Sequence, residues 1–229
     1  ESRRAKGITR FTINHIAKPF EYNYYRTGIS VGDYPIDHHH KKNPTAPQHL
    51  DFYPVPSFNI PLGSLIPEKM DGLIVCDKSI SVSNVVNGST RLQPCVLLTG
   101  QAAGMLAALS VLQKKQPRNI SVREVQNNLL QAGACIMPYI DVPFTHKHFT
   151  AIQKIGVTGI LKGAGIPYKW ANQTWFYPDS VIEAEIFARD VKVCTGIQFN
   201  SQNKMVTVSD IIQYITDTYK SRGKTILSE

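Results

Sequence analysis

Apolar and polar residues follow one pattern along this chain up to about residue 138 and a different pattern after it. Residues 7–13 and 27–34 alternate between apolar and polar positions, as strands with one buried face do. Residues 73–76, Leu-Ile-Val-Cys, form a short apolar run that predicts a strand covered on both faces. Residues 77–91 are polar and predict a poorly ordered loop, and small and apolar residues at 94–115 predict a helix.

Local signals mark the ends of several segments. Ser121 and Glu124 have the spacing of a capping box, and Gly133 follows as a helix stop, so we expect a helix between them. Upstream, five prolines within eighteen residues exclude a helix and favour extended backbone: Pro44, Pro47, Pro54, Pro56 and Pro61.

The region after residue 138 is dominated by helical spacing. Apolar residues from Phe149 to Val157 indicate one helix, and a second is expected after Asp179. A third is expected from Val208 to Lys220, with Ser209 as its N-cap. We therefore predict a mixed α/β (α+β) chain with two domains, residues 1–138 and a small helical bundle at 139–229.

Composition and charge restrict the classes of partner. The 229 residues are 42% hydrophobic and 18% charged, as in folded globular proteins rather than disordered ones. The net charge of +8 comes from scattered basic residues, so we expect no nucleic-acid partner, whereas polyanionic glycans suit such a surface. No run has the eighteen apolar residues of a membrane span, and we expect none. The four cysteines lie far apart, which indicates no metal site and leaves their disulfide state open.

Four segments occur in the order typical of one enzyme family. They are ESRR at residues 1–4, YPIDHH at 34–39, IPLGSLIP at 60–67 and the block at 71–104 that ends in GQAAG. Together they make about the first 135 residues resemble the FAD-dependent oxidoreductases, some of which are labelled xanthan lyases. The resemblance implies the C-terminal part of a flavoprotein-like two-layer domain, in which an antiparallel sheet faces the substrate and a last strand and helix return to the flavin.

The pyrophosphate-binding element of such a flavoprotein does not occur in the sequence. Its G-x-G-x-x-G turn follows a strand and opens a helix, whereas Gly163-Ala164-Gly165 is followed by Ile166-Pro167. We therefore expect the chain to be a C-terminal portion whose partner is the missing N-terminal half of the same protein. FAD is expected in the full-length protein and not in this chain alone.

The resemblance also implies site residues. His38 matches the histidine after YPID and would accept a proton as hydride leaves a substrate, and Arg4 would hold an anionic substrate or the electron-rich edge of the flavin. The helix start at GQAAG would direct its positive end at the flavin. The cofactor-binding residues expected on this basis are Asp77, Arg91, Gly100, Gln101, Ala102 and Gly104.

Other interpretations of the same residues remain open. His38 to His40 also suit a polar loop, Arg4 suits a structural ion pair, and the GQAAG residues suit a helix packed tightly on a sheet. Three residues depart from the family pattern: Asp77 stands where a glycine is usual, and Asn84 and Val85 stand where a histidine and an acid are usual. A divergent or inactive member of the family is therefore an alternative hypothesis.

About fifty residues of the second region resemble a single S-layer-homology repeat, a module that often binds cell-wall polysaccharide. The resemblance rests on HKHFTAI, GILKG and WFYPD, and we expect Phe176 to be buried with Trp170 or Trp175 more exposed. It implies a non-catalytic glycan- or envelope-binding function as the alternative to an oxidoreductase acting on an unknown substrate, carbohydrate included. A polysaccharide lyase is a third alternative, without a recognisable Tyr/His/Arg cluster. The periplasm or the cell exterior is favoured over the cytoplasm.

Overall fold

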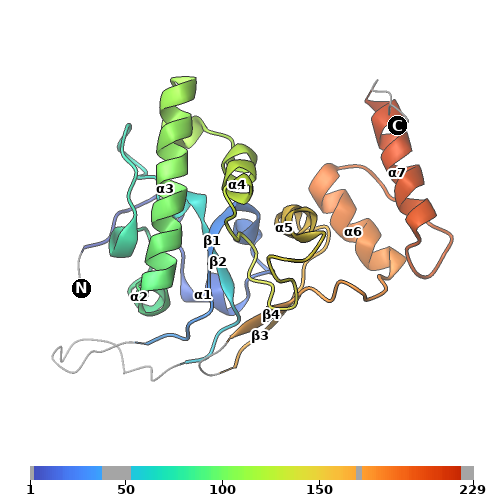
Figure 1. Cartoon of the computed structure of the whole chain (residues 1–229), viewed down its shortest axis with the longest axis horizontal. Helices are drawn as coiled ribbons and strands as arrows, with labels where there is room; N and C mark the ends of the chain where they lie inside the picture. Colours follow the sequence, from blue (N-terminus) through green and yellow to red (C-terminus); the bar gives the residue numbers. More distant parts are fainter. Residues whose placement is uncertain (1–2, 38–52, 169–171, 223–229) are drawn as a thin grey trace.

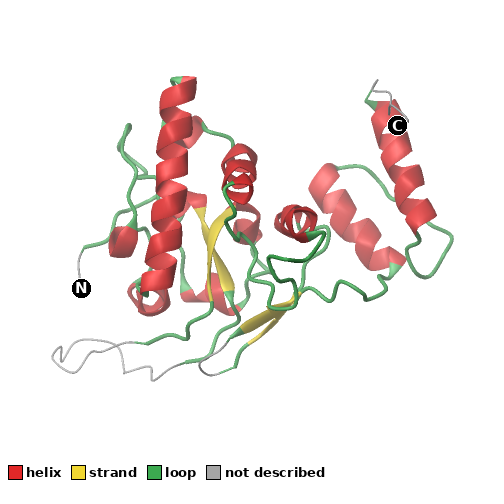
Figure 2. Cartoon of the chain, viewed as in Figure 1, coloured by secondary structure: helices red, strands yellow, loops and turns green. Residues whose placement is uncertain are grey.

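The computed structural model describes residues 3–37, 53–168 and 172–222 (Figure 1). These residues form seven α-helices and two antiparallel sheets of two strands each, which confirms the mixed α+β class. In the view of Figure 2 the strands lie in the middle of the chain, with α2 and α3 to one side and α6 and α7 to the other. Short elements complete the set: α1 (Ile13–Ala17) and 3₁₀ turns at Asn23–Thr27, Leu62–Ser64, Asp77–Ser79 and Pro117–Asn119.

The larger core is built on β1 (Gly28–Gly32) and β2 (Phe58–Pro61), which pair with Gly32 opposite Phe58. Both strands are almost fully buried, and α3 (Gln93–Gln113) lies against β1. The contact is close, because a Cβ at Gly32 would approach the Phe58 ring to 2.6 Å and Cys95 Sγ to 2.8 Å. The strand predicted within residues 27–34 is thus confirmed, and glycine allows α3 to begin directly on it.

Two predicted helices of this part are confirmed, although one of their caps is not. Helix α3 matches the expected range of 94–115, and α4 (Val122–Gln131) ends before Gly133, whose φ is +78°. The capping box predicted at the start of α4 is wrong: Ser121 makes no side-chain cap, and the Glu124 carboxylate instead accepts a hydrogen bond from the Gln113 amide of α3. The Glu124 carboxylate, which the capping box would have used, therefore joins α4 to α3 instead.

Two predictions between residues 73 and 91 are wrong. Residues 73–76 are extended but do not form a strand. Val75 N–H donates to Leu65 O at 2.8 Å, but within the described residues no neighbouring strand pairs with this segment, as a strand requires. The expected loop contains α2 (Asn84–Thr90), which Ser83 caps by accepting a hydrogen bond from Val86 N–H. Residues 86–90 of α2 are buried, and Val86 belongs to the core. This segment is therefore packed rather than poorly ordered.

The core formed by the first part of the chain continues beyond residue 138. Helix α5 (Phe149–Thr158) adds Ile152 and Val157 to it, and β3 (Ala164–Ile166) and β4 (Gln173–Trp175) follow. A second, small core forms between α6 (Ala184–Thr195) and α7 (Val208–Ser221), around Phe187, Val191 and Phe199. The described residues thus share one core up to about Val157, while the division into domains at 138 stays a prediction.

Helix α7 covers the predicted range, but its N-cap does not lie at Ser209. Thr207 caps the helix by accepting a hydrogen bond from Asp210 N–H at 3.1 Å, while the Asp210 carboxylate accepts one from Thr207 N–H at 2.9 Å. Threonine followed three residues later by an acid is itself a capping box, so this cap was visible in the sequence.

Candidate functional site

The N-terminal segment runs beside residues 79–83, and this pairing positions Arg4. Ala5 N–H donates to Ser79 O at 2.8 Å, and Phe11 and Val82 form a parallel bridge further along. Arg4 therefore lies at the first residue of α2, where its Nη2 donates to Asn84 Oδ1 at 3.3 Å. Asn84 stands where the resembled family usually has a histidine, so this departure lies in direct contact with the candidate arginine.

The YPID segment meets the residue that follows α2. Arg91 Nη2 lies 3.4 Å from the Asp37 carbonyl oxygen and 3.5 Å from its Oδ2, and Asp37 is only 8% exposed. Partial burial raises the pKa of the Tyr34 hydroxyl, the charge of Asp37 acts in the same direction, and Arg91 opposes it. Tyr34 thus stays protonated at neutral pH and is able to donate a hydrogen bond.

These contacts place two cations at opposite ends of α2. A helix of seven residues is about 10 Å long, so the contact of Arg4 at Asn84 and the backbone of Arg91 after Thr90 lie at positions on α2 that are roughly that far apart. Helix α3 begins two residues after Arg91, and its first turn carries N–H groups that lack intrahelical partners. The sequence marked Arg4 and Arg91 as site residues, but Asp37 and Tyr34 were missed, although both lie in the YPID motif that pointed to this region.

The expected helix start at GQAAG is wrong. Helix α3 begins at Gln93, so Gly100, Gln101, Ala102 and Gly104 lie in its interior, two turns from the positive end of the helix. Ala102 is buried in the core, whereas Gln101 and Gly104 are exposed. The region that carries the partial positive charge is instead the turn that follows Arg91.

Tight packing among the described residues does not account for the two glycines either. Within that part of the chain, a Cβ built at Gly100 or Gly104 would meet no neighbouring atom within 4 Å. They belong to an open surface of α3, which we call the α3 face. Its apolar members are unusually exposed, with Leu97 at 73%, Val111 at 77% and Leu112 at 78%. The α3 face consists of Leu97, Gly100, Gln101, Gly104, Ala107, Ala108, Val111 and Leu112.

Helix α3 is also long and apolar enough, by length and composition alone, to cross a membrane, contrary to what the runs of apolar residues suggested. The side opposite the α3 face is built into the core through Cys95, Ala102 and Leu106. A core helix with one uncovered side explains the composition without a membrane.

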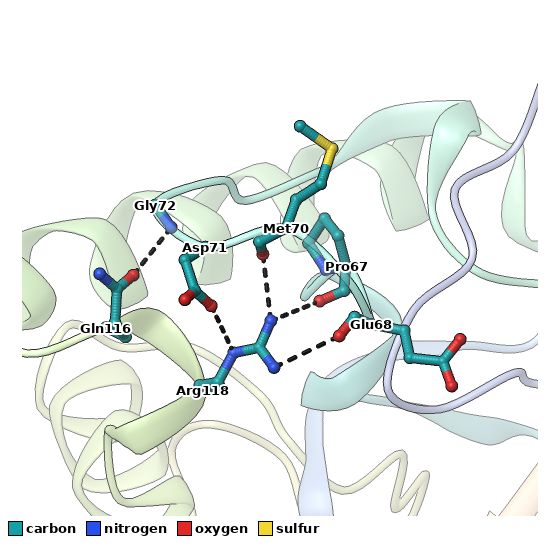
Figure 3. A network of polar contacts seen from close by, with 7 residues as sticks. All are labelled: Pro67, Glu68, Met70, Asp71, Gly72, Gln116 and Arg118. Carbon is teal, nitrogen blue, oxygen red and sulfur yellow. Dashed lines mark hydrogen bonds and ion pairs between the residues drawn. The ribbon is translucent and has the colours of Figure 1, made fainter.

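Beside the α3 face, a network of polar contacts holds the turn at residues 67–72 (Figure 3). Arg118 donates to the carbonyls of Pro67, Glu68 and Met70 at 3.1–3.3 Å, and its Nε lies 3.0 Å from Asp71 Oδ1. This turn leads into the extended residues 73–76, which face a hollow of about 410 Å³ along the C-terminal half of α3. Residues 73–76, which follow the turn that Arg118 holds in place, therefore extend the surface of the α3 face.

The remaining predicted residues either do not contact the two arginines or lie outside the described residues. Asp77 is exposed with φ of +61°, and its carboxylate accepts a local hydrogen bond from Lys78 N–H at 2.7 Å. His38 and Trp170 lie outside the described residues, so the catalytic role expected of His38 stays a prediction. The four cysteines are free: Cys76, Cys95, Cys135 and Cys194.

A second feature lies at the WFYPD motif. Trp175 stacks on Tyr177 with ring centroids 5.9 Å apart, and Tyr177 is 46% exposed beside a cavity of about 490 Å³. The Asp141 carboxylate fixes this turn by accepting hydrogen bonds from the N–H groups of Phe176 and Tyr177. The expectation that Phe176 is buried is wrong, because its ring is half-buried against Tyr139 at the edge of the core.

Comparison with known proteins assigns a family to residues 1–129. A family model described as FAD dependent oxidoreductase matches residues 1–129, which carry the two arginines, α2, α3 and most of α4. No curated protein and no solved structure matches the chain. The family model does not reach the second core, so the resemblance to an S-layer-homology repeat stays a prediction. The matched residues are more than half of the chain, which therefore belongs to the FAD-dependent oxidoreductase family.

Proposed function

We propose that this chain is the C-terminal portion of a flavin-dependent oxidoreductase, and that the FAD-binding N-terminal half of the same protein packs on the α3 face. The observation that carries the proposal is the exposure of that face within the family-matched residues. Leu97, Val111 and Leu112 leave a large apolar surface in water, which folded proteins rarely do without a partner. Gly100 and Gly104 allow the backbone of that partner to approach closely.

The residues at the start of α3 fit a flavin. Two arginines at the ends of α2 and the partial positive charge at the start of α3 are suited to the negative charge of a reduced flavin. When bound, FAD would accept a hydride from a substrate C–H bond. Arg91 would orient the YPID segment through Asp37, and the protonated Tyr34 hydroxyl would donate a hydrogen bond into the site.

The proton released from the substrate needs an acceptor. Asn84 has no basic nitrogen, so it cannot take the proton that a histidine at this position would accept. It holds Arg4 in place instead. We assign the proton-accepting role to His38, which directly follows the YPID segment in the sequence. Arg91 holds that segment in place through Asp37. The substrate class that we propose is carbohydrate, supported by the aromatic pair at Trp175 and Tyr177 in the same chain.

One substitution tests the docking of the N-terminal half separately from the folding of this chain. Gly104→Leu adds a side chain at a position where a Cβ meets no atom of the described residues within 4 Å, and leucine favours a helix more than glycine does, so the chain alone should keep its stability. In the protein that contains the N-terminal half, the same change should block close packing and release the flavin. Absorbance near 450 nm per chain is the readout, and Ala132→Leu, at an exposed position at the end of α4, is the matched control. Equal flavin content in both variants would refute docking on the α3 face.

A second candidate function is glycan binding by the C-terminal part, with an extracytoplasmic location as its consequence. The supporting observation is the exposed ring of Tyr177, which stacks on Trp175 beside the cavity at residues 160–163 and α6. Cell-wall polysaccharide should change tryptophan fluorescence, and Tyr177→Ala should weaken this binding by at least tenfold. Tyr53→Ala, a similarly exposed tyrosine elsewhere, is the control. Unchanged fluorescence at saturating polysaccharide would exclude this function. A polysaccharide lyase, the third alternative, would in addition cleave the polymer, and viscometry separates it from binding alone.

A further inference from the structure

Charged side chains surround the cavity of about 490 Å³ beside Tyr177, which we call the Tyr177 cavity. The charged residues that line it are Lys162, Glu183, Arg189 and Asp190. The Asp190 carboxylate is largely buried, and its Oδ1 lies 3.0 Å from Lys162 Nζ and 3.1 Å from Arg189 Nε. Both cations of the cavity are therefore directed at a carboxylate of the protein itself.

Further carboxylates lie at the turn that presents the Tyr177 ring to solvent. Asp141 accepts a hydrogen bond from Tyr177 N–H at 2.7 Å, and Asp179 follows two residues later as an exposed side chain. Glu183 is exposed as well, at the N-cap position of α6. Acidic side chains in and beside the Tyr177 cavity thus outnumber the two basic ones that line it.

This charge pattern opposes an anionic polymer, although the whole chain carries a net charge of +8. The Debye length is about 8 Å at physiological ionic strength, so basic residues far from the cavity are largely screened there. A carboxylate of a polymer would meet the nearby acids and would compete with Asp190 for Lys162 and Arg189. A sugar hydroxyl, in contrast, donates a hydrogen bond to a carboxylate without repulsion.

We propose that the Tyr177 cavity binds an uncharged polysaccharide and discriminates against polyanionic ones. This selectivity rests on the glycan-binding function proposed above for the same cavity. The Tyr177 ring, stacked on Trp175, offers a flat face to a sugar ring, and the apolar residues of the lining suit its C–H groups. They are Ile160, Leu161, Ile182 and Ile186. The scattered basic residues of the surface therefore do not select the ligand of this cavity.

One polymer in two forms tests the proposal. The probe is a cell-wall polysaccharide that contains uronic acids, used as isolated and after chemical reduction of its carboxylates to alcohols. Tryptophan fluorescence of the full chain is followed during titration at about 150 mM salt. The reduced, uncharged form should bind at least about tenfold more tightly, because like charges in contact are costly. Tyr177→Ala should weaken the binding of the reduced form, which assigns that binding to this cavity.

Two glutamates of α6 separate the charge of the cavity from the charge of the whole chain. Glu183→Gln removes a negative charge from the lining of the cavity and should narrow the preference for the uncharged form about threefold, the order expected for one nearby charge in water. Glu185→Gln removes the same charge from an exposed position in the first turn of α6, outside that lining. This control should leave the preference nearly unchanged. Circular dichroism should show equal melting for both variants, since both side chains are exposed.

Three results would overturn the proposal, and they separate it from the glycan-binding function itself. Equal or tighter binding of the anionic form would refute the selectivity and leave glycan binding intact. Equal effects of the two glutamine variants would show that charges outside the Tyr177 cavity set the preference. Unchanged fluorescence with both forms of the polymer would refute glycan binding by this cavity, and the selectivity with it.

Discussion

Gln153 gives the sharpest test of how α5 is joined to the first core. It is fully buried, and its Oε1 accepts hydrogen bonds from Ile136 N–H at 2.9 Å and Met137 N–H at 2.7 Å. Its Nε2 donates to Met137 O at 2.9 Å. Methionine has a similar length without these groups, so Gln153→Met leaves two buried N–H groups without a partner. The Met137 carbonyl retains the Tyr139 N–H at 3.0 Å.

Each orphaned N–H costs about 1–3 kcal/mol, so the substitution should lower the free energy of unfolding by about 4 kcal/mol. With a urea dependence of about 2 kcal/mol per molar, the midpoint should fall by roughly 2 M. Far-ultraviolet circular dichroism in urea measures this shift. Gln131→Met, on the exposed side of α4, should change the midpoint by less than about 0.3 M. A shift in Gln153→Met as small as in the control would show that α5 is not tied to residues 136–137, and that a domain boundary near residue 138 is correct.

Three further outcomes follow from other contacts. Arg118→Met should lower the free energy of unfolding by about 1 kcal/mol in urea melts, because three backbone carbonyls exchange the guanidinium for water. Recovery by Arg118→Lys would contradict the role of the planar guanidinium in this network. Burial raises the pKa of the Cys95 thiol to about 12 and of the Cys135 thiol to about 11, so both have little thiolate at pH 8. Mass spectrometry after brief iodoacetamide treatment should find exposed Cys76 modified before either, and early labelling of Cys95 would oppose this burial. Hydrogen bonds from Thr207 lower the pKa of Asp210. The stabilisation by this cap is therefore fully present above the ordinary carboxyl pKa and is lost as pH falls through the lowered value. An ordinary pKa for Asp210 in an NMR titration would contradict this cap.

Three helices were predictable from signals that lie within one segment. A run of small and apolar residues predicted α3, the stop signal at Gly133 marked the end of α4, and apolar residues at helical spacing predicted the range of α7. Helix α2 was not predictable in this way, because its sequence, NVVNGST, is rich in polar and β-branched residues that favour loops and strands. Its burial against the core overrides these preferences.

The site depends on contacts between distant segments, and these were only partly predictable. Family-like motifs marked Arg4 and Arg91, but not that Arg4 meets Asn84 eighty residues away or that Arg91 meets Asp37. The error at residues 73–76 has a similar cause. An apolar run shows that a segment is suited to a sheet, but its pairing partner lies elsewhere and decides whether a strand forms.

The central claim is that the flavin is held jointly by this chain and an FAD-binding half that packs on the α3 face. The most direct measurement is the flavin content of the purified chain, alone and in the protein that contains its N-terminal half, by absorbance near 450 nm. We predict a colourless chain alone and about one flavin per molecule in the longer protein, as expected of a resident cofactor. Stoichiometric flavin on this chain alone would contradict the shared site. A longer protein that binds no flavin would contradict the oxidoreductase function itself.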